Sequence, residues 1–287
     1  MTLRENMKVE LWYQLPVTAE IDYIMECALK AERIGFDGVS NEDHFWVTGI
    51  GGGCRPECWT MLTAVAMKTN LKVAPLVVCI PYRNPTLLAK IVTTLDHLSK
   101  GRVMLIYGAG WWREEFEAFG YQWEPDRVRV DRTIEAVRLI KRIWTEDSVT
   151  FEGKYYRVRN CRLDPRPYQK PHPPILCGGS GKRMRTFAAK YLDGWVAPVN
   201  IRKGVEEYVE RRKIVDKYVG NRKFIYGICT RFKMDEMDVD YLIRRVEEYI
   251  KLGVTWVNFR MDPDTENLRL LDKIAPVIRY FKEKYGR

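Results

Sequence analysis

Two features of the sequence predict an α/β fold with a parallel sheet. The first is a set of short apolar runs rich in β-branched residues, such as 73–80 and 103–107, which suit strands covered on both faces. The second is a set of longer segments in which apolar residues recur every three or four positions, as in the helix expected after Pro85, with Asn84 as its N-cap. Small residues at 108–110 follow the second run. They would lie at the carboxyl end of a strand, which is where parallel sheets bind ligands.

The same patterns divide the rest of the chain into alternating strands and helices. Thr18 is expected to cap the first helix, Gly35 to end it, and Pro56 to begin the second helix. The strands are expected at 8–14, 38–40, 73–80, 103–107, 174–177, 195–199, 224–230 and 254–259. The other helices are expected at 19–34, 56–68, 114–119, 131–144, 182–191, 205–218, 239–252 and 268–284.

An insertion separates the fourth strand from the fifth. Residues 149–158 have the pattern of a β-hairpin, and 165–174 form a proline-rich loop. Eight strands, each followed by a helix, are the count of a (βα)8 TIM barrel, whose active site lies on the strand-to-helix loops. An open doubly wound sheet is the alternative. We expect residues 1–287 to form a single domain, because no linker is visible and barrels of this length commonly do.

Composition excludes several classes of protein. Hydrophobic residues at 46% and aromatic residues at 12% exclude a disordered chain. No apolar run reaches the roughly 18 to 20 residues of a membrane span, and no apolar core follows the charged residues 1–8. We therefore expect a cytoplasmic protein without a membrane partner.

The net charge of +10 comes from 48 Lys and Arg against 38 Asp and Glu. These basic residues are scattered and form no arginine-rich block, so we expect no nucleic-acid partner. A polyanionic cofactor tail would benefit from the positive field. Dense charge and only three Gln also fit a thermophile.

The seven cysteines predict no metal site. They contain no CxxC pair, and most occur in apolar strand or helix contexts that suit small core residues. Cys54 and Cys58 share a glycine-rich loop after His44 and are the one pair that could meet a metal or each other. No second nearby His or carboxylate has ligand spacing.

His44 is the candidate catalytic residue. It follows the second expected strand, next to Asp43, and an imidazole can exchange protons near neutral pH. From the residues alone, a histidine that caps a loop remains an open alternative. A second candidate feature is the run from Gly178 to Lys182, which precedes a helix and offers backbone amides and a cation to an anion. Leu176 and Arg183 exclude a Walker loop there, which favours a cofactor phosphate over a nucleoside triphosphate.

Several motifs surround these candidates: Gly35-Phe36-Asp37, Glu42-Asp43-His44-Phe45, Tyr82-Arg83-Asn84-Pro85, Gly101-Arg102, Gly108-Ala109-Gly110-Trp111, Pro173-Pro174-Ile175 and Asp193-Gly194-Trp195. Together they resemble the bacterial luciferase-like superfamily, and most closely its branch that depends on the deazaflavin coenzyme F420. The residues after Val199 match that family only in the order of their elements. The resemblance implies the barrel fold, a homodimer and an oxidoreductase activity.

The resemblance also implies roles for individual residues. His44 would stand beside the deazaflavin ring with Asp43 as its partner, and the non-prolyl cis peptide that the family places behind the ring would be Cys79–Ile80. The cofactor-binding set that the resemblance implies is Asp43, His44, Cys79, Ile80, Tyr82, Ala109, Gly110, Glu114, Gly178, Gly179, Ser180, Gly181 and Lys182. The substrate contacts are expected to be Trp46, Trp111 and Trp112.

The function that the resemblance implies is hydride transfer between F420 and an unidentified small organic substrate. Alcohols, methylene-tetrahydropterins and enones remain open. Trp111 and Trp112 stand where the family's sugar-phosphate dehydrogenases carry a catalytic Glu, which argues against a phosphorylated sugar and favours an aromatic wall for an apolar or planar substrate; core packing is the alternative. An FMN-dependent monooxygenase that uses O2 is the second reading, and a non-catalytic cofactor-binding barrel or basic nucleic-acid binder is the third.

Overall fold

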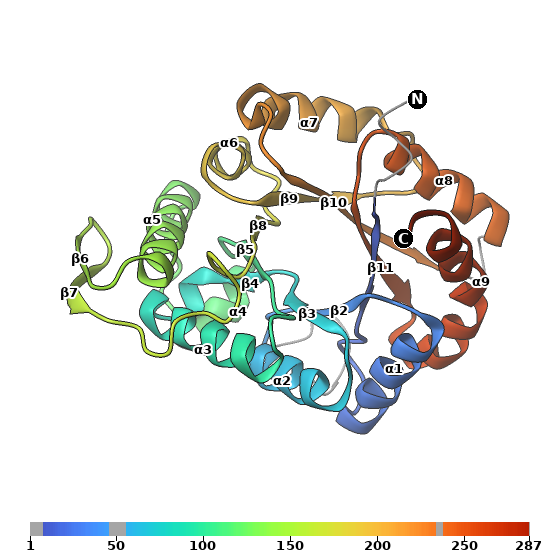
Figure 1. The fold of residues 1–287 in the computed structure, drawn as a ribbon, viewed down its shortest axis with the longest axis horizontal. Helices are drawn as coiled ribbons and strands as arrows, with labels where there is room; N and C mark the ends of the chain where they lie inside the picture. The colour runs from blue at the N-terminus through green and yellow to red at the C-terminus, as the bar shows by residue number, and fades with distance from the viewer. Residues whose placement is uncertain (1–7, 46–55, 234–237, 287) are drawn as a thin grey trace.

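The computed structural model describes residues 8–45, 56–233 and 238–286, in which parallel strands form a barrel surrounded by helices (Figure 1). The strands pair in the order β3-β2-β1-β11-β10-β9-β8-β5-β4. An isolated parallel bridge between Val73 and Val103 joins β3 to the segment before β5 and closes the ring. The predicted TIM barrel is therefore confirmed. Its strands are β1 (Glu10–Gln14), β2 (Gly38–Asn41), β3 (Lys72–Pro75), β4 (Val78–Cys79), β5 (Leu105–Gly108), β8 (Ile175–Cys177), β9 (Gly194–Val199), β10 (Ile225–Lys233) and β11 (Trp256–Asp262).

The helices lie outside the strands and follow the predicted order. They are α1 (Ile21–Ile34), α2 (Cys58–Lys68), α3 (Pro85–Leu98), α4 (Arg113–Ala118), α5 (Asp126–Thr145), α6 (Lys182–Tyr191), α7 (Glu206–Val219), α8 (Val239–Lys251) and α9 (Asn267–Tyr285). The part of the chain that the structure describes also contains the short 3-10 helices η1 (Ile80–Tyr82) and η3 (Asp264–Glu266).

The helix starts test the predicted caps. The Asn84 cap is confirmed, because its side-chain oxygen accepts from the Thr86 N–H at 2.9 Å. The Thr18 cap is wrong: α1 begins after Glu20, and the Thr18 hydroxyl instead donates to Asp264 at 2.9 Å. The cap of α2 is Glu57, which accepts from the Thr60 N–H at 2.7 Å.

The run from 73 to 80 is not one strand. It divides into β3 and β4 at Leu76-Val77, which is a non-prolyl cis peptide. The predicted cis peptide at Cys79–Ile80 is therefore wrong, and the bond lies three residues earlier. Ile80 instead begins the 3-10 helix η1.

The predicted insertion is present between β5 and β8. Strands β6 (Val149–Glu152) and β7 (Arg157–Cys161) pair antiparallel and project at the edge of the molecule beside α5 (Figure 1). Glu135 of α5 holds the hairpin by accepting from the backbone N–H groups of Tyr155 at 2.7 Å and Tyr156 at 2.8 Å.

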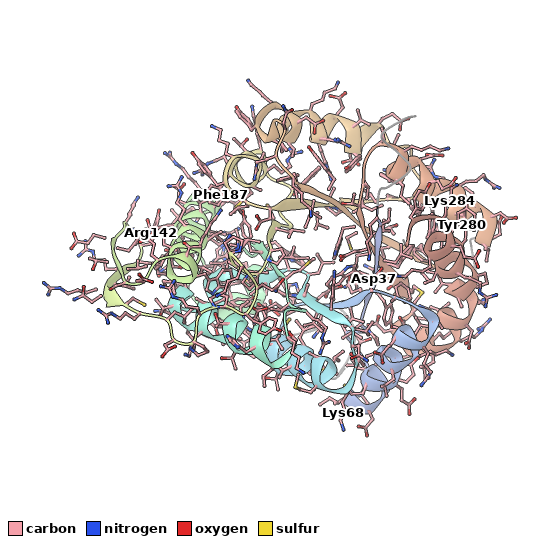
Figure 2. All side chains as sticks on the ribbon, in the orientation of Figure 1. Asp37, Lys68, Arg142, Phe187, Tyr280 and Lys284 are labelled. Carbon is pink, nitrogen blue, oxygen red and sulfur yellow. The ribbon has the colours of Figure 1, made fainter. Side chains whose placement is uncertain are left out.

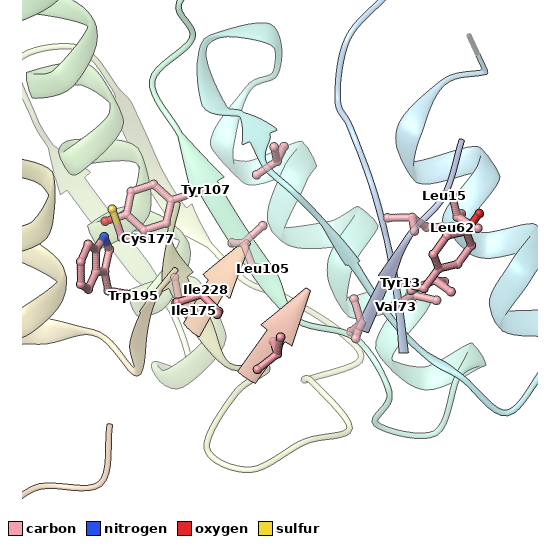
Figure 3. Packing of buried hydrophobic residues seen from close by; sticks show 14 of the residues in the cluster. Tyr13, Leu15, Leu62, Val73, Leu105, Tyr107, Ile175, Cys177, Trp195 and Ile228 are labelled. Carbon is pink, nitrogen blue, oxygen red and sulfur yellow. The ribbon is translucent and has the colours of Figure 1, made fainter. Parts of the chain in front are cut away.

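The core has two layers because side chains alternate along each strand. Tyr107, Cys177 and Trp195 lie side by side in the layer between strands and helices (Figure 3). A second cluster fills the barrel interior, where the Trp12 and Trp256 rings lie 5.2 Å apart. Because these side chains fill the barrel interior, a ligand can bind only at an end of the barrel, and barrel active sites lie at the carboxyl ends of the strands.

Charged side chains cover the outer faces of the helices (Figure 2). On α9, the ammonium group of Lys284 donates to the Tyr280 hydroxyl at 2.8 Å and pairs with Glu247. None of the helices in the described part of the chain combines the length and apolar character that crossing a bilayer requires.

Candidate active site

A cavity of about 440 Å³ opens at the carboxyl ends of the barrel strands. Its volume lies within the range of small-molecule sites. Every barrel strand except β4, or the loop that follows it, contributes to the lining, which consists of Gln14, Glu42, His44, Leu76, Val77, Gly110, Trp111, Trp112, Gly178, Val196, Pro198, Cys229, Arg231 and Arg260. The cavity is therefore a product of nearly the whole barrel.

His44 lies on the cavity wall and is held from behind by Glu115. The His44 Nδ1 atom is 2.8 Å from the Glu115 Oε2 atom, and the Glu115 side chain is wholly buried. A carboxylate at this distance fixes the ring orientation and keeps the proton on Nδ1. The Nε2 atom is therefore the ring nitrogen available to a ligand in the cavity.

Glu115 is itself fixed by two more donors. Its Oε1 atom accepts from the Phe45 backbone N–H at 2.7 Å, and its Oε2 atom accepts from the Tyr82 hydroxyl. Burial and the hydrogen bond to Glu115 raise the pKa of Tyr82, so its hydroxyl remains protonated and continues to donate. His44, Glu115 and Tyr82 form the polar network of this wall, which we call the His44 network.

The resemblance implied Asp43 as the partner of His44 and Glu114 as a cofactor contact, and neither is the carboxylate of the His44 network. Glu114 is exposed on α4 and does not line the cavity, whereas Glu115 and Phe116 form the buried face of that helix. The site therefore contains a glutamate, Glu115, although Trp111 and Trp112 stand where the resemblance would place one. The sequence signal for Glu115 was its place directly before an apolar residue on a short helix, but a six-residue helix offers too little periodicity to choose between neighbours.

Asp43 anchors the loop that carries His44. Its Oδ2 atom accepts from the Cys79 backbone N–H at 2.9 Å, and its two oxygens accept from Arg83 at 2.6 and 2.8 Å. Burial raises the pKa of Asp43, although the Arg83 guanidinium opposes this shift. Asp43 thus ties the end of β2 to the end of β4, and the carboxylate partner of His44 is Glu115.

The bulge at Leu76 and Val77 forms part of the cavity wall. A Cβ atom on Gly108 would lie 2.6 Å from Val77 Cγ2, and one on Gly178 would overlap Val77 Cγ1. The Val77 side chain therefore fits between the ends of β5 and β8 because both positions are glycine. Gly178 was expected in an anion-binding loop, and no local pattern in the sequence indicates this packing role.

Cys79 and Ile80 lie behind the cavity wall. Both side chains are buried, and neither lines the cavity. Gly110 separates Cys79 from the cavity: its φ is +77°, and a Cβ atom there would lie 2.6 Å from the Phe116 ring and 3.0 Å from the Cys79 sulfur. Ala109, the preceding residue, is half-buried and packs against the main core.

Trp111 and Trp112 extend the wall beyond His44. Their rings stack 6.0 Å apart, and the Trp111 ring meets the His44 ring edge-on at 5.7 Å. Trp111 is 68% exposed, which excludes the core-packing alternative for that residue. Trp46 lies outside the described residues.

The run from Gly179 to Lys182 lies at the start of α6. Gly181 is the N-cap of the helix and makes no side-chain cap hydrogen bond, so the first N–H groups of α6 suit an anion. Gly178 lines the cavity, whereas Ser180, Gly181 and Lys182 are exposed outside that lining.

Among the described residues, no group of three His, Cys, Asp or Glu side chains has the arrangement of a metal site. Cys58 is buried, with its thiol 3.6 Å from the Asn41 carbonyl oxygen. Cys54 lies outside the described residues.

The sequence analysis missed a polar group on the β1, β10 and β11 side of the cavity. Glu42 follows β2 and belongs to the Glu42-Asp43-His44-Phe45 motif, but the other residues carried no recognisable motif, although period-two alternation along a barrel strand directs such positions inward. The members of this polar group are Gln14, Glu42, Cys229, Arg231 and Arg260. Burial raises the pKa of the Cys229 thiol to about 11, so Cys229 is neutral at physiological pH.

A parallel barrel with a histidine-bearing cavity at its strand ends has the architecture of a barrel enzyme. Residues 7–216 match the family model described as luciferase-like monooxygenase. The chain belongs to this luciferase-like family.

Relatives within the family differ in cofactor. An FMNH2-dependent dimethylsulfone monooxygenase from Pseudomonas putida is 34% identical over 67% of this chain and 52% of its own length. An F420-dependent glucose-6-phosphate dehydrogenase from Amycolatopsis mediterranei (strain U-32) is 32% identical over 66% of this chain and 56% of its own length. The chain thus spans about half the length of the curated relatives it matches.

A solved structure supports the fold independently. An F420-dependent secondary alcohol dehydrogenase in complex with an F420–acetone adduct superposes with a TM-score of 0.80. The alignment covers 95% of this chain and 99% of that one, at 19% identity. The likeness covers the tail after residue 216, which the family model does not match.

Proposed function

We propose that this protein is an oxidoreductase that transfers a hydride between coenzyme F420 and a small organic substrate. The observation that carries the proposal is the His44 network on the wall of a cavity at the carboxyl ends of the barrel strands. Family membership and the F420-dependent dehydrogenases among its relatives support the choice of cofactor.

The residues present fit a deazaflavin. Leu76 and Val77 give an apolar wall for a planar ring, and Gly110 places backbone rather than a side chain in the lining. Gly179 to Lys182, at the start of α6, would hold a cofactor phosphate through backbone N–H groups and the Lys182 ammonium. Tyr82 and Asp43 do not line the cavity but stabilise the wall that carries His44. Tyr82 donates to Glu115, and Asp43 accepts from Arg83.

Coenzyme F420 supplies the hydride chemistry when it is bound. The protein residues would position the substrate and manage the proton. His44 Nε2 would hydrogen-bond the substrate oxygen and exchange a proton with it, while Glu115 stabilises the charged imidazolium. Trp111 and Trp112 would exclude water from the reacting groups.

The second candidate is an FMN-dependent monooxygenase that uses O2. The Pseudomonas putida relative supports it, because that protein is FMNH2-dependent and matches two thirds of this chain. The same cavity would hold the flavin ring, which would supply the chemistry with O2 when bound, and His44 would face the substrate.

Turnover assays separate the two candidates. The purified protein is supplied with reduced F420 or reduced FMN and a panel of ketones, methylene-tetrahydropterins and enones, while cofactor oxidation and O2 uptake are followed. Hydride transfer predicts substrate-dependent oxidation of F420 without O2, abolished by His44→Ala and retained by His97→Ala on the outer helix α3. Substrate-dependent O2 uptake with FMN alone would instead establish the monooxygenase.

We also propose that residues 1–287 act as one domain and form a homodimer. Apolar side chains are exposed on the neighbouring helices α1, α2 and α3, namely Ile21, Met67, Leu87 and Leu98. Light scattering should give twice the chain mass, and the double substitution Leu87→Asp and Leu98→Asp should lower the measured mass. A monomeric wild type would contradict the proposal.

A cytoplasmic location and a thermophilic source remain proposals from composition, tested by cell fractionation and by the unfolding temperature.

A further inference from the structure

We infer that the substrate carries an anionic group, a carboxylate, sulfonate or phosphate, and that Arg231 and Arg260 bind it. Both arginines line the cavity that holds His44. The inference rests on the proposed function, because it assigns the chemical class of the substrate for the same cavity.

Strand register places the two arginines together. Arg231 of β10 is aligned with Arg260 of β11 in the parallel pairing of these strands. On β10, Cys229 and Arg231 are two residues apart and both line the cavity, which shows that this face of the strand points inward. Two like charges directly opposite on neighbouring strands repel each other, so this pair requires counter-charges.

Two carboxylates supply the counter-charges and hold the guanidinium groups in place. Arg231 donates to the two oxygens of Asp262 at 2.5 and 3.2 Å, and Arg260 donates to Glu42. Glu42 is in turn held by the Gln14 amide at 2.9 Å. These four charges sum to zero, so an anion would be recognised by oriented donors rather than by excess local charge.

Donors remain on both arginines after these contacts. A guanidinium carries five N–H groups, and the bidentate pair with Asp262 occupies only the Nε and Nη2 atoms of Arg231. The Nε atom of Arg260 is buried and has no hydrogen-bond partner within the described residues; the nearest paired carboxylate oxygen, on Asp262, is 3.9 Å away. Buried donors are normally satisfied, which indicates that water or a ligand oxygen completes this group.

The rest of the lining defines the other end of the ligand. Leu76, Val196 and Pro198 are apolar, and Trp111 and Trp112 add aromatic surface. Planar guanidinium groups match the geometry of carboxylate, sulfonate and phosphate oxygens. The site therefore suits an amphipathic molecule with an apolar or planar body and an anionic end.

Binding of benzoate and benzamide tests the inference, because the two probes have nearly the same shape and differ in charge. Isothermal titration of the wild-type protein should show that benzoate binds at least about 10-fold more tightly, a factor equal to one oriented charge-assisted contact. Arg231→Gln and Arg260→Lys should each remove most of this preference and leave benzamide binding unchanged. Arg142→Gln is the matched control, because Arg142 also pairs bidentately with one carboxylate, Glu146, but lies on α5.

Two further measurements decide whether the arginines bind an anionic group of the substrate or a phosphate of the cofactor. If it belongs to the substrate, benzoate binds to F420-loaded protein and the arginine variants keep F420 affinity within about threefold, well below one tenfold step. Competition between benzoate and F420, or loss of F420 affinity in both variants, would overturn the assignment to the substrate. Equal wild-type affinities for benzoate and benzamide would overturn the anion site itself.

The anion site and the proposed cofactor can be contradicted independently. Failure of the protein to bind F420, with the benzoate preference intact, would contradict the cofactor and leave the anion site standing. Arg260→Lys retains the charge beside Glu42, so circular dichroism should show a folded protein, and any loss of preference then reports the missing guanidinium.

Discussion

The two sides of the cavity are built on different principles. The His44 network rests on one wholly buried carboxylate, Glu115, which engages an imidazole, a hydroxyl and a backbone N–H. The β10–β11 side consists of ion pairs, in which the Arg231 side chain is 65% exposed and the Arg260 side chain 20%. The buried side fixes one ring in one orientation, whereas the exposed side keeps donors that a ligand can engage.

Because of this difference, the two sides of the cavity should respond differently to mutation. Removing one member of a buried hydrogen-bonded group leaves its partners unsatisfied, at about 1–3 kcal/mol for each group. An ion pair that water reaches, such as that of the 65% exposed Arg231, is worth about 0–1 kcal/mol because water screens it. We therefore expect changes in the His44 network to affect both folding and turnover, and changes among the arginines to affect ligand binding.

Glu115→Gln should give the largest effect. Glutamine keeps the size of the side chain but removes the charge that orients and stabilises protonated His44. Turnover should fall by about 10²- to 10⁴-fold, the range of a general acid–base contribution. Glu114→Gln, on the exposed face of the same helix, should stay within about threefold of wild type, because surface changes away from such features have small effects. Activity of the Glu115→Gln protein near the wild-type level would show that the network is only structural.

Gly178→Ala should destabilise the protein by about 1–3 kcal/mol, since its Cβ would overlap Val77 Cγ1. Gly179→Ala is the matched control, because the nearest atom to its Cβ, on Met184, is at 3.4 Å, and it should change stability by less than about 0.5 kcal/mol. Urea unfolding measures both. Adding Val77→Ala to Gly178→Ala should recover part of the loss; no recovery would argue against the packing of Val77 between glycines.

Tyr82→Phe and Tyr280→Phe compare buried and surface versions of the same hydrogen bond. Tyr82 donates to buried Glu115, and Tyr280 donates to Glu247 at 2.6 Å on the outer surface. Tyr82→Phe should lower the free energy of unfolding by about 1–2 kcal/mol, and Tyr280→Phe by less than about 0.5 kcal/mol. Equal losses in urea titrations would contradict the expectation that a buried hydrogen bond in the His44 network is worth more than one on the outer surface.

The smallest effect concerns pH and the layer beneath Gly178. Burial raises the pKa of the Cys177 thiol to about 11, from the ordinary value of 9.0 for an exposed thiol. The neutral thiol is favoured in the folded state, so its contribution is complete below pH 9 and is lost as pH rises through about 11. Between pH 9 and pH 10 the wild type should lose about 1 kcal/mol more than Cys177→Ala. Parallel stability curves for the two proteins would contradict a buried, neutral Cys177.

The barrel was predictable because its signals are local. The helix at 182–191 and the Asn84 cap follow from periodicity and from one side chain next to its own helix. The packing of the Val77 side chain was not predictable, because it depends on Gly108 of β5 and on Gly178 just after β8, both far along the chain.

The site was predictable only where a motif marked it. His44 carried such a motif, whereas the choice between Glu114 and Glu115 depended on the rotation of a six-residue helix. Arg231 and Arg260 lie beyond residue 216, where the family model ends, and they meet only through the register of β10 and β11. Long-range register of this kind leaves no local signal in the sequence.

Equilibrium titration of the purified protein with F420 and with FMN, followed by tryptophan fluorescence, tests the central claim most directly. Trp111 and Trp112 line the cavity, so a bound ring should quench their emission. We expect saturable quenching by F420 at lower concentration than by FMN, and loss of this quenching when both tryptophans are replaced by Phe. Quenching by neither cofactor, or unchanged quenching in the double variant, would contradict the assignment of this cavity as the cofactor site.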